Sequence, residues 1–321
     1  MLIVWAAAWA GYGDVEDSRP SAAERWLHLW TNAARVAPEE FEDDYAQGGC
    51  SLSADFSADE RSPKAPLYLD VGLAEAARYH SEDMASEGCF QHESCDGTDT
   101  WARIGRYYDE GSTLGENIAL GQVDGRYAVL SMWMCSESGH RANIMSSSFN
   151  ELGTGVAEGT GATLFTQDFA QGQVPEGQPV RIAAHDGSSF YADWGDASPP
   201  TRLELVLDGQ EREMKLAHGA PEQGVYHADS PVSACVSWWV EWETESGQSG
   251  FFPEEGAYFA GSGCEADWAL RADAGSSGHD DEADEEDGGS GLKVVGCTTA
   301  PSSPGWWLTC LILLSLRPRR P

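Results

Sequence analysis

The sequence predicts an α+β domain over residues 21–170 and a small all-β module over residues 179–270. Apolar residues recur at helical spacing in segments that end before residue 136. Two strand-like runs joined by a glycine-rich turn then close the first domain. Residues 171–178 contain Gly and Pro and are interpreted as a linker, after which short alternating runs replace the helical spacing. We therefore expect helices packed on an antiparallel sheet, followed by a β-sandwich.

The first predicted helix covers residues 21–36. It begins with Ser21-x-x-Glu24, the spacing of a capping box, in which each residue satisfies a free backbone N–H of the other. Trp26 and Trp30 follow at helical spacing, so one face of this helix is expected to be buried.

Two further helices are predicted before the strands. The second runs from Val71 to about Glu87 and places His80 on its apolar face, where a hydrogen-bonded core histidine is expected, with a ligand as the alternative. The third covers about Gly125 to Cys135 and turns Trp133 toward the core.

Strands are predicted where short apolar runs are separated by turn residues. In the first domain these runs are 152–156 and 163–169, and in the all-β module they are 180–183, 201–207, 211–216, 224–226, 235–244 and 258–259.

The composition limits the classes of partner. A chain of 321 residues with a formal charge of −34 repels phosphate, so nucleic-acid binding is not expected.

The eight cysteines include no CxxC pair, which disfavours a structural zinc site and favours disulfides formed in an oxidising compartment. The expected pairs are Cys235 with Cys264 in the all-β module, and Cys89 with Cys95 or Cys50 with Cys135 in the first domain.

Both ends of the chain predict export. Residues 1–10 are apolar and end in Ala-Trp-Ala, the pattern of a signal-peptide remnant, with an N-terminal core strand as the alternative. Residues 271–292 are acidic and glycine-rich and predict a disordered stalk. Residues 296–321 contain Cys297, an apolar run and terminal arginines, and resemble the C-terminal sorting signals of myxobacterial surface proteins. That resemblance implies attachment to the membrane or cell surface through Cys297.

A group of polar residues recurs beside small and aromatic residues. The segments are Leu67–Met84, Phe90-x-His92-x-Ser94, Arg103-Ile104, Gly115–Ala119 with Glu116, Trp133-x5-Gly139–Ile144 with His140, Gly153-x-Gly155-Val156 and Thr166-Gln167-x-Phe169. In this order and spacing the first domain resembles the CAP superfamily, named for cysteine-rich secretory proteins, antigen 5 and plant pathogenesis-related proteins. It is most similar to the bacterial SCP-type branch.

The resemblance implies a three-layer α-β-α sandwich with a cleft lined by two histidines and two acidic residues. His92, Glu116 and His140 occupy three of these positions, and the second acidic position falls on Ser136. Glu137, the next residue, substitutes for it only if the helix end rotates.

The cleft predicts an extracellular binding module that holds Zn²⁺ or another divalent cation between His92 and His140, because neutral imidazoles are common zinc ligands. The expected partner is a small molecule, a lipid or a peptide. The alternative is a hydrolase of peptide or cell-wall substrates that uses Glu116 with a metal-bound water, or with Ser94 or Ser136 as nucleophile. A third interpretation is that the histidines and Glu116 only brace the cleft.

Overall fold

The computed structural model describes residues 20–109 and 113–271, which belong to one compact unit. The predicted leader at 1–10, the stalk at 271–292 apart from Arg271, and the sorting signal at 296–321 with Cys297 lie outside the described residues. Within the described ranges, no helix is both long enough and apolar enough to cross a bilayer.

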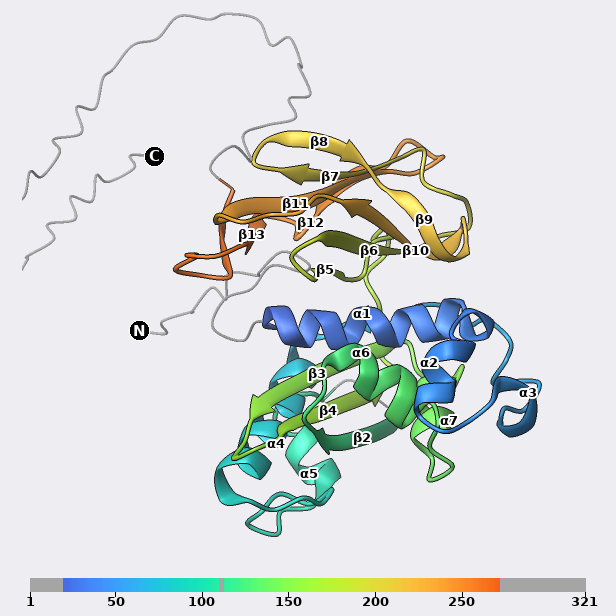
Figure 1. Ribbon diagram of the computed structural model, residues 1–321, viewed down its shortest axis with the longest axis vertical. Helices are drawn as coiled ribbons and strands as arrows, with labels where there is room; N and C mark the ends of the chain where they lie inside the picture. Colours follow the sequence, from blue (N-terminus) through green and yellow to red (C-terminus); the bar gives the residue numbers. More distant parts are fainter. Residues whose placement is uncertain (1–19, 110–112, 272–321) are drawn as a thin grey trace, which may run out of the picture. The chain divides into compact units, whose positions relative to one another are not determined.

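The first part of the chain is a three-layer α-β-α sandwich (Figure 1). Its sheet has the order β1-β3-β4-β2, in which only β1 and β3 are parallel. Helix α4 packs on one face of the sheet, and α1 with the π-helical segment η2 covers the other. The helical elements are α1 (Ala22–Val36), η1 (Pro38–Glu40), α2 (Glu42–Gln47), α3 (Leu52–Asp55), α4 (Val71–Glu87), α5 (Thr100–Ile104), α6 (Gly125–Tyr127), η2 (Ala128–Trp133) and α7 (His140–Ile144). The strands are β1 (Tyr68–Leu69), β2 (Leu114–Gly121), β3 (Glu151–Glu158) and β4 (Thr163–Ala170).

The predicted capping box begins α1. Ser21 Oγ accepts a hydrogen bond from the Glu24 backbone N–H, and the Glu24 carboxylate accepts one from the Ser21 N–H at 2.6 Å. The same carboxylate is buried and binds the Arg78 guanidinium of α4 through two hydrogen bonds. Glu24 therefore both starts α1 and links the two helical layers.

The third predicted helix is shorter and less regular than expected. Residues 125–127 form α6, residues 128–133 form η2, and the helical hydrogen bonds stop before Cys135.

Strand β2, which contains Glu116, was not among the predicted strands. Its sequence Leu-Gly-Glu-Asn-Ile-Ala-Leu-Gly lacks the polar–apolar alternation of a half-buried strand because both of its faces are covered.

The all-β module consists of two sheets, which confirms the predicted β-rich second part. One has the order β5-β6-β10-β9, and the other has the order β14-β13-β11-β7-β8 with β12 beside β11. Strands β6, β12 and β14 were not predicted. The bounds are β5 (Ala183–His185), β6 (Ser189–Gly195), β7 (Arg202–Leu207), β8 (Gln210–Glu213), β9 (Lys215–Ala220), β10 (Gln223–Asp229), β11 (Val236–Glu243), β12 (Ser249–Phe252), β13 (Gly256–Ala260) and β14 (Trp268–Leu270).

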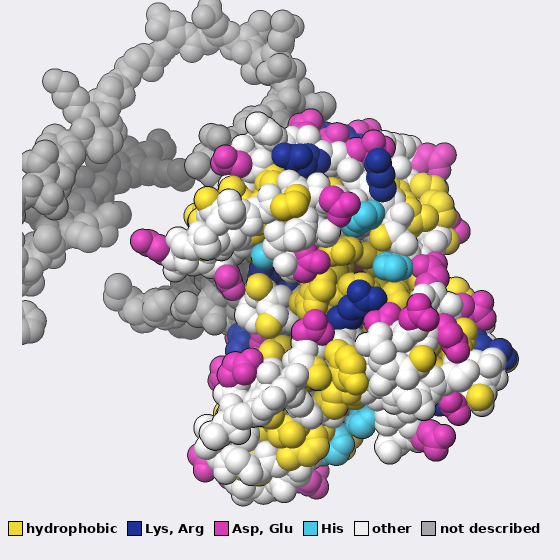
Figure 2. Space-filling view, viewed as in Figure 1, with side chains coloured by type: hydrophobic (Ala, Val, Ile, Leu, Met, Phe, Trp, Pro, Cys, Tyr) yellow, Lys and Arg dark blue, Asp and Glu magenta, His cyan; other side chains and the backbone are white. Residues whose placement is uncertain are grey.

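Helix α1 is shared by both parts of the chain. It packs on β5, β6, β9 and β10 as well as on the first sheet, and in Figure 1 it lies between the two sets of strands. Asn32 donates a hydrogen bond to the buried Asp193 carboxylate of β6 at 2.6 Å, and the Arg25 guanidinium lies 3.9 Å from the ring centre of Tyr258 in β13. Figure 2 shows hydrophobic side chains at the level of this helix. The two parts therefore bury a common core.

Three disulfides confirm the expected cysteine pairs, including both alternatives for the first domain. Their Cα–Cα distances of 5.4, 5.9 and 5.0 Å lie in the range that a disulfide spans without backbone movement. The pairs are Cys50–Cys135, Cys89–Cys95 and Cys235–Cys264.

Candidate functional site

His92 lies on the loop between α4 and α5, and this loop is held at both ends. The Cys89–Cys95 disulfide closes it on one side. On the other side, the Thr100 hydroxyl and the Arg103 guanidinium of α5 each donate a hydrogen bond of 2.8 Å to the His92 carbonyl oxygen. The histidine backbone is thereby fixed although its side chain is 52% exposed.

Glu116 of β2 is the buried partner of His92. Its side chain is 1% exposed, and His92 Nδ1 donates to Glu116 Oε1 at 2.7 Å. The other carboxylate oxygen, Oε2, accepts a hydrogen bond from the fully buried guanidinium of Arg103. Because the carboxylate can only accept, Nδ1 of His92 carries the proton, and the neutral ring turns an unprotonated Nε2 away from Glu116.

His140 forms a second, separate pair with Ser136. Gly139, at φ 104°, turns the chain into α7, and His140 Nδ1 lies 2.8 Å from Ser136 Oγ. The Asn117 side chain of β2 donates to the His140 carbonyl oxygen at 3.1 Å, while Asn143 donates to the Glu116 carbonyl oxygen at 3.2 Å. These amides tie the His140 segment to the strand that carries Glu116.

A second buried carboxyl group, that of Asp168, lies close to the Glu116 carboxylate. Asp168 of β4 is the direct cross-strand neighbour of Glu116, and it is fully buried. Burial, followed by the charge of the nearby Glu116, raises the pKa of Asp168 well above its ordinary value. The Arg103 guanidinium pairs with Glu116 and acts on Asp168 only as a nearby charge, so the protonated form of Asp168 is favoured beside the Glu116 carboxylate.

The surroundings of the two histidines shift their pKa values in opposite directions. The hydrogen bond to Glu116 is the main cause that raises the pKa of His92. Burial, together with the charge of nearby His92, lowers the pKa of His140. The hydrogen bond to Glu116 therefore stabilises the charged form of His92 relative to a free imidazole, whereas burial stabilises the neutral form of His140.

The hydrolase alternative requires a serine, a histidine and a carboxylate in one chain of hydrogen bonds. Ser136 contacts His140, whereas Glu116 contacts His92, so the two pairs are not joined into a triad. Ser94 is buried, and within the described ranges its hydroxyl has no hydrogen-bond partner.

Glu137 is exposed and makes neither a hydrogen bond nor an ion pair in the described part of the chain, so it does not replace the second acid.

The acidic and imidazole groups do not form a closed metal cage. In the part of the chain that the structure describes, the ligand atoms of His92, Glu116 and His140 do not all lie within 4.8 Å of one another. Asp83, Cys89 and Cys95 do meet that distance, but both sulfur atoms belong to the Cys89–Cys95 disulfide and Asp83 already accepts the Cys95 N–H. Imidazole Nε2 atoms with solvent in the remaining positions are the donor set that suits a divalent cation here.

Two members of the site were not among the predicted site residues. Arg103 and Asp168 both lie in the segments on which the family resemblance was based, yet neither was identified as part of the cleft. A signal for Asp168 is present in the sequence: a carboxylate next to Phe169 in a predicted strand is costly to bury. The pairing with Glu116 depends on strand register, which the sequence pattern did not reveal.

Residues 31–169 match the model of the CAP family, described as the cysteine-rich secretory protein family. The protein YkwD of Bacillus subtilis is 36% identical over 104 residues, which are 32% of this chain and 39% of YkwD. The membrane protein YlbC of the same organism is 37% identical over 105 residues, which are 33% of this chain and 29% of YlbC. The match thus spans less than half of either relative. A solved structure of an extracellular SCP-domain protein from Bacillus anthracis is 34% identical, with 33% of each chain covered and a TM-score of 0.30.

Proposed function

We propose that the CAP domain formed by residues 31–169 is a binding module whose cleft holds a divalent cation between His92 and His140. The observation that supports this most directly is the His92–Glu116 pair. A buried carboxylate, itself paired with Arg103, orients a half-exposed imidazole by its Nδ1 and leaves Nε2 without a contact to Glu116. This is the outer-sphere arrangement that fixes histidine ligands in metal sites.

The donor set favours an exchangeable ion. The two imidazoles supply two nitrogen donors, and Glu116 already accepts hydrogen bonds with both oxygens. A tetrahedral Zn²⁺ then has two positions left for water or for a donor group of a bound ligand. The ion would hold and polarise that ligand, while the residues around it keep the imidazoles in place.

Zinc titration by calorimetry tests this proposal. The full chain is used with Cys297 and Cys310 replaced by serine, because thiols outside the three disulfides bind Zn²⁺ themselves. We expect His92→Ala and His140→Ala each to weaken binding by at least about tenfold. His227→Ala is the matched control, since this histidine lies on β10, outside the candidate site, where it pairs with Asp229. Equal zinc affinity in all four proteins would exclude the site.

We further propose that the module acts outside the cell and is attached there through Cys297. Three disulfides in the described residues fit an oxidising compartment. The partner would be a small molecule, a lipid or a peptide that reaches the exposed side of His92. Expression of wild type and Cys297→Ser, followed by fractionation into cell-bound and released protein, tests the attachment. Unchanged retention of the Cys297→Ser chain contradicts it.

A further inference from the structure

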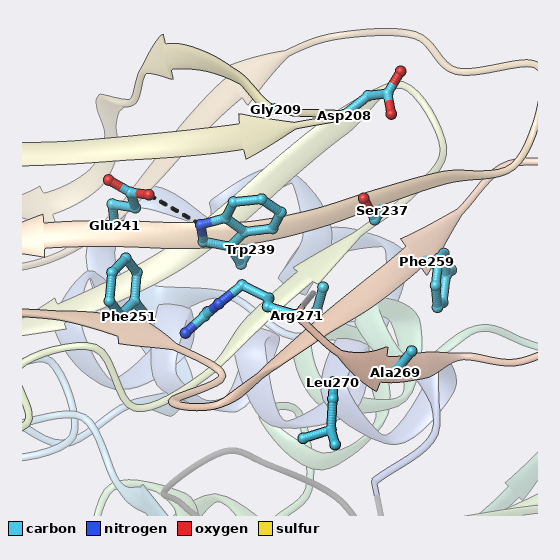
Figure 3. A pocket seen from close by; sticks show the side chains of 11 residues that line it. Asp208, Gly209, Ser237, Trp239, Glu241, Phe251, Phe259, Ala269, Leu270 and Arg271 are labelled. Carbon is cyan, nitrogen blue, oxygen red and sulfur yellow. Dashed lines mark hydrogen bonds between the residues drawn. The ribbon is translucent and has the colours of Figure 1, made fainter. Parts of the chain in front are cut away.

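The outer face of the β14-β13-β11-β7-β8 sheet contains a pocket of about 510 Å³ (Figure 3), and none of its lining residues belongs to the candidate histidine site. Its position follows from the alternation of β11. Trp238, Val240 and Trp242 point into the core, whereas Ser237, Trp239 and Glu241 point outward and line the pocket. A volume of this size is typical of small-molecule sites, which range over about 300–1,000 Å³.

Large rings surround small residues in this pocket. Phe251 of β12 is the cross-strand neighbour of Glu241, and Phe259 of β13 is that of Ser237. Ala257 and Ala269, which pair across β13 and β14, also line it. The alanine pair leaves the space between the rings unfilled, so the sheet presents a hollow with aromatic walls.

Arg271 is fixed within the same pocket. Its guanidinium donates to the carbonyl oxygens of Pro253, Glu254 and Gly256, and it lies 4.2 Å from the ring centre of Phe251 and 5.5 Å from that of Trp239. A guanidinium held in this way keeps its orientation without the entropy cost of ordering a long side chain on binding.

Carboxylate acceptors also line the pocket. Glu241 accepts a hydrogen bond from Trp239 Nε1 at 3.1 Å, drawn in Figure 3, and another from Arg202 at 3.0 Å. Asp208, at φ 50° in the turn between β7 and β8, presents an exposed carboxylate. The rim thus combines carboxylate acceptors, the Ser237 hydroxyl and the Arg271 guanidinium around aromatic faces.

We propose that this pocket binds a neutral sugar unit of a polysaccharide. A pyranose ring has a face of C–H groups that packs on an aromatic ring, and hydroxyls around its edge that both donate and accept. The carboxylates of Asp208 and Glu241 match the hydroxyl donors, while the Ser237 hydroxyl matches the acceptors. Aromatic stacking supplies affinity and the charged rim fixes the orientation.

Charged ligands fit this pocket less well. A quaternary ammonium would have to bind beside the Arg271 guanidinium, whose like charge repels it. Anionic polymers are repelled by a chain with a formal charge of −34, and Asp and Glu side chains are scattered over the face shown in Figure 2.

Calorimetric titration of the full chain with oligosaccharides tests the proposal. The neutral probes are cellohexaose, chitohexaose and maltohexaose, and the anionic probe is hexagalacturonate. We expect at least one neutral probe to bind, and Trp239→Ala to weaken that binding by at least about tenfold, which is the loss of one aromatic anchor. Trp101→Ala is the matched control, because Trp101 of α5 is a 49% exposed tryptophan outside the pocket.

A second variant, Phe259→Ala, is measured alongside, and near-UV circular dichroism confirms that each variant is folded. Three results overturn the proposal. They are no binding of any neutral probe at millimolar concentration, tighter binding of hexagalacturonate, and binding that folded Trp239→Ala or Phe259→Ala leaves unchanged.

Discussion

Glu116 is the residue on which the candidate site depends, because its carboxylate joins the buried Arg103 to the half-exposed His92. Glu116→Gln keeps the shape of the side chain and removes its charge. We expect the pKa of His92 to fall toward its ordinary value, because the hydrogen bond to Glu116 is the main cause of its rise. We also expect the free energy of unfolding to fall by about 1–3 kcal/mol, since the Arg103 guanidinium loses part of its counter-charge. NMR titration of the imidazole protons and urea unfolding measure the two effects.

Asp168→Asn is the matched control for that variant. Burial and the Glu116 charge favour the protonated form of Asp168, which an amide resembles in size and charge. The pKa of His92 is therefore expected to stay raised, with a smaller loss of stability. If Asp168→Asn lowers the pKa of His92 as much as Glu116→Gln does, then the charge that raises the pKa of His92 comes from Asp168 and not from Glu116.

At the level of elements, the contact between α4 and β3 depends on two glycines. A Cβ added to Gly153 would meet the backbone of Leu73 and Ala74, and one added to Gly155 would meet the backbone of Ala77 and Arg78. We expect Gly153→Ala to lower the free energy of unfolding by about 1–3 kcal/mol or more, because backbone atoms cannot move aside as a flexible side chain can.

Gly121→Ala is the control for this prediction. Gly121 ends β2, and a Cβ there would meet only side-chain atoms, the nearest at 3.4 Å. Thermal unfolding followed by circular dichroism compares the two variants. A Gly153→Ala chain as stable as Gly121→Ala would show that α4 moves away from β3 without cost.

The Cys50–Cys135 disulfide ties α2 and α3 to the end of η2. It closes a loop of 85 residues, which in the chain-entropy account stabilises the folded state by about 4–5 kcal/mol, whereas Cys89–Cys95 spans 6 residues and contributes less. We expect the double variant Cys50→Ser/Cys135→Ser to lose several kcal/mol in urea unfolding and Cys89→Ser/Cys95→Ser to lose less. The opposite order would show that strain or unfolded-state structure dominates over loop entropy.

How far the sequence predicts each element depends on how local its signal is. Helix α1 was predicted by its capping box and α4 by its apolar face, because both signals lie within a few residues. Strand β2 was missed because it is buried on both faces and does not alternate. For the site, the family resemblance identified His92, Glu116 and His140, whereas the roles of Arg103 and Asp168 depend on strand register and on how α5 packs beside β2.

At the scale of the whole molecule, α1 acts as a middle layer between two sets of strands. Its sequence predicted one buried face, yet Leu27, Trp30, Ala33 and Ala34 are all buried, as are polar residues such as Asn32. A helix buried nearly all round must have partners on both sides. The second partner is the β5–β6–β10–β9 sheet, so the all-β module completes the core of the first domain in addition to displaying a surface of its own.

The link between Asn32 and Asp193 makes this shared core sensitive to pH. Burial is the main cause that raises the pKa of Asp193 to about 6, above the value of about 3.9 for an unfolded chain. The folded state therefore holds an extra proton between about pH 4 and pH 6, and the stability contributed by this group falls as the pH rises through that window. Above pH 6 the loss is complete and is on the order of 3 kcal/mol.

Asp193→Asn removes this titration, although the amide also loses one acceptor for Asn32 at every pH. We expect the free energy of unfolding in urea, measured at pH 4.5, 5.5 and 7, to fall less steeply in Asp193→Asn than in wild type. Asp43→Asn, at an exposed position of α2, serves as the control because the other titrating groups are common to all three proteins. Since only the slope is compared, the constant loss of the Asn32 hydrogen bond cancels. Parallel pH profiles for wild type and Asp193→Asn would mean that Asp193 is already ionised throughout this range, held by Asn32 and the backbone N–H groups of Arg181 and Ile182.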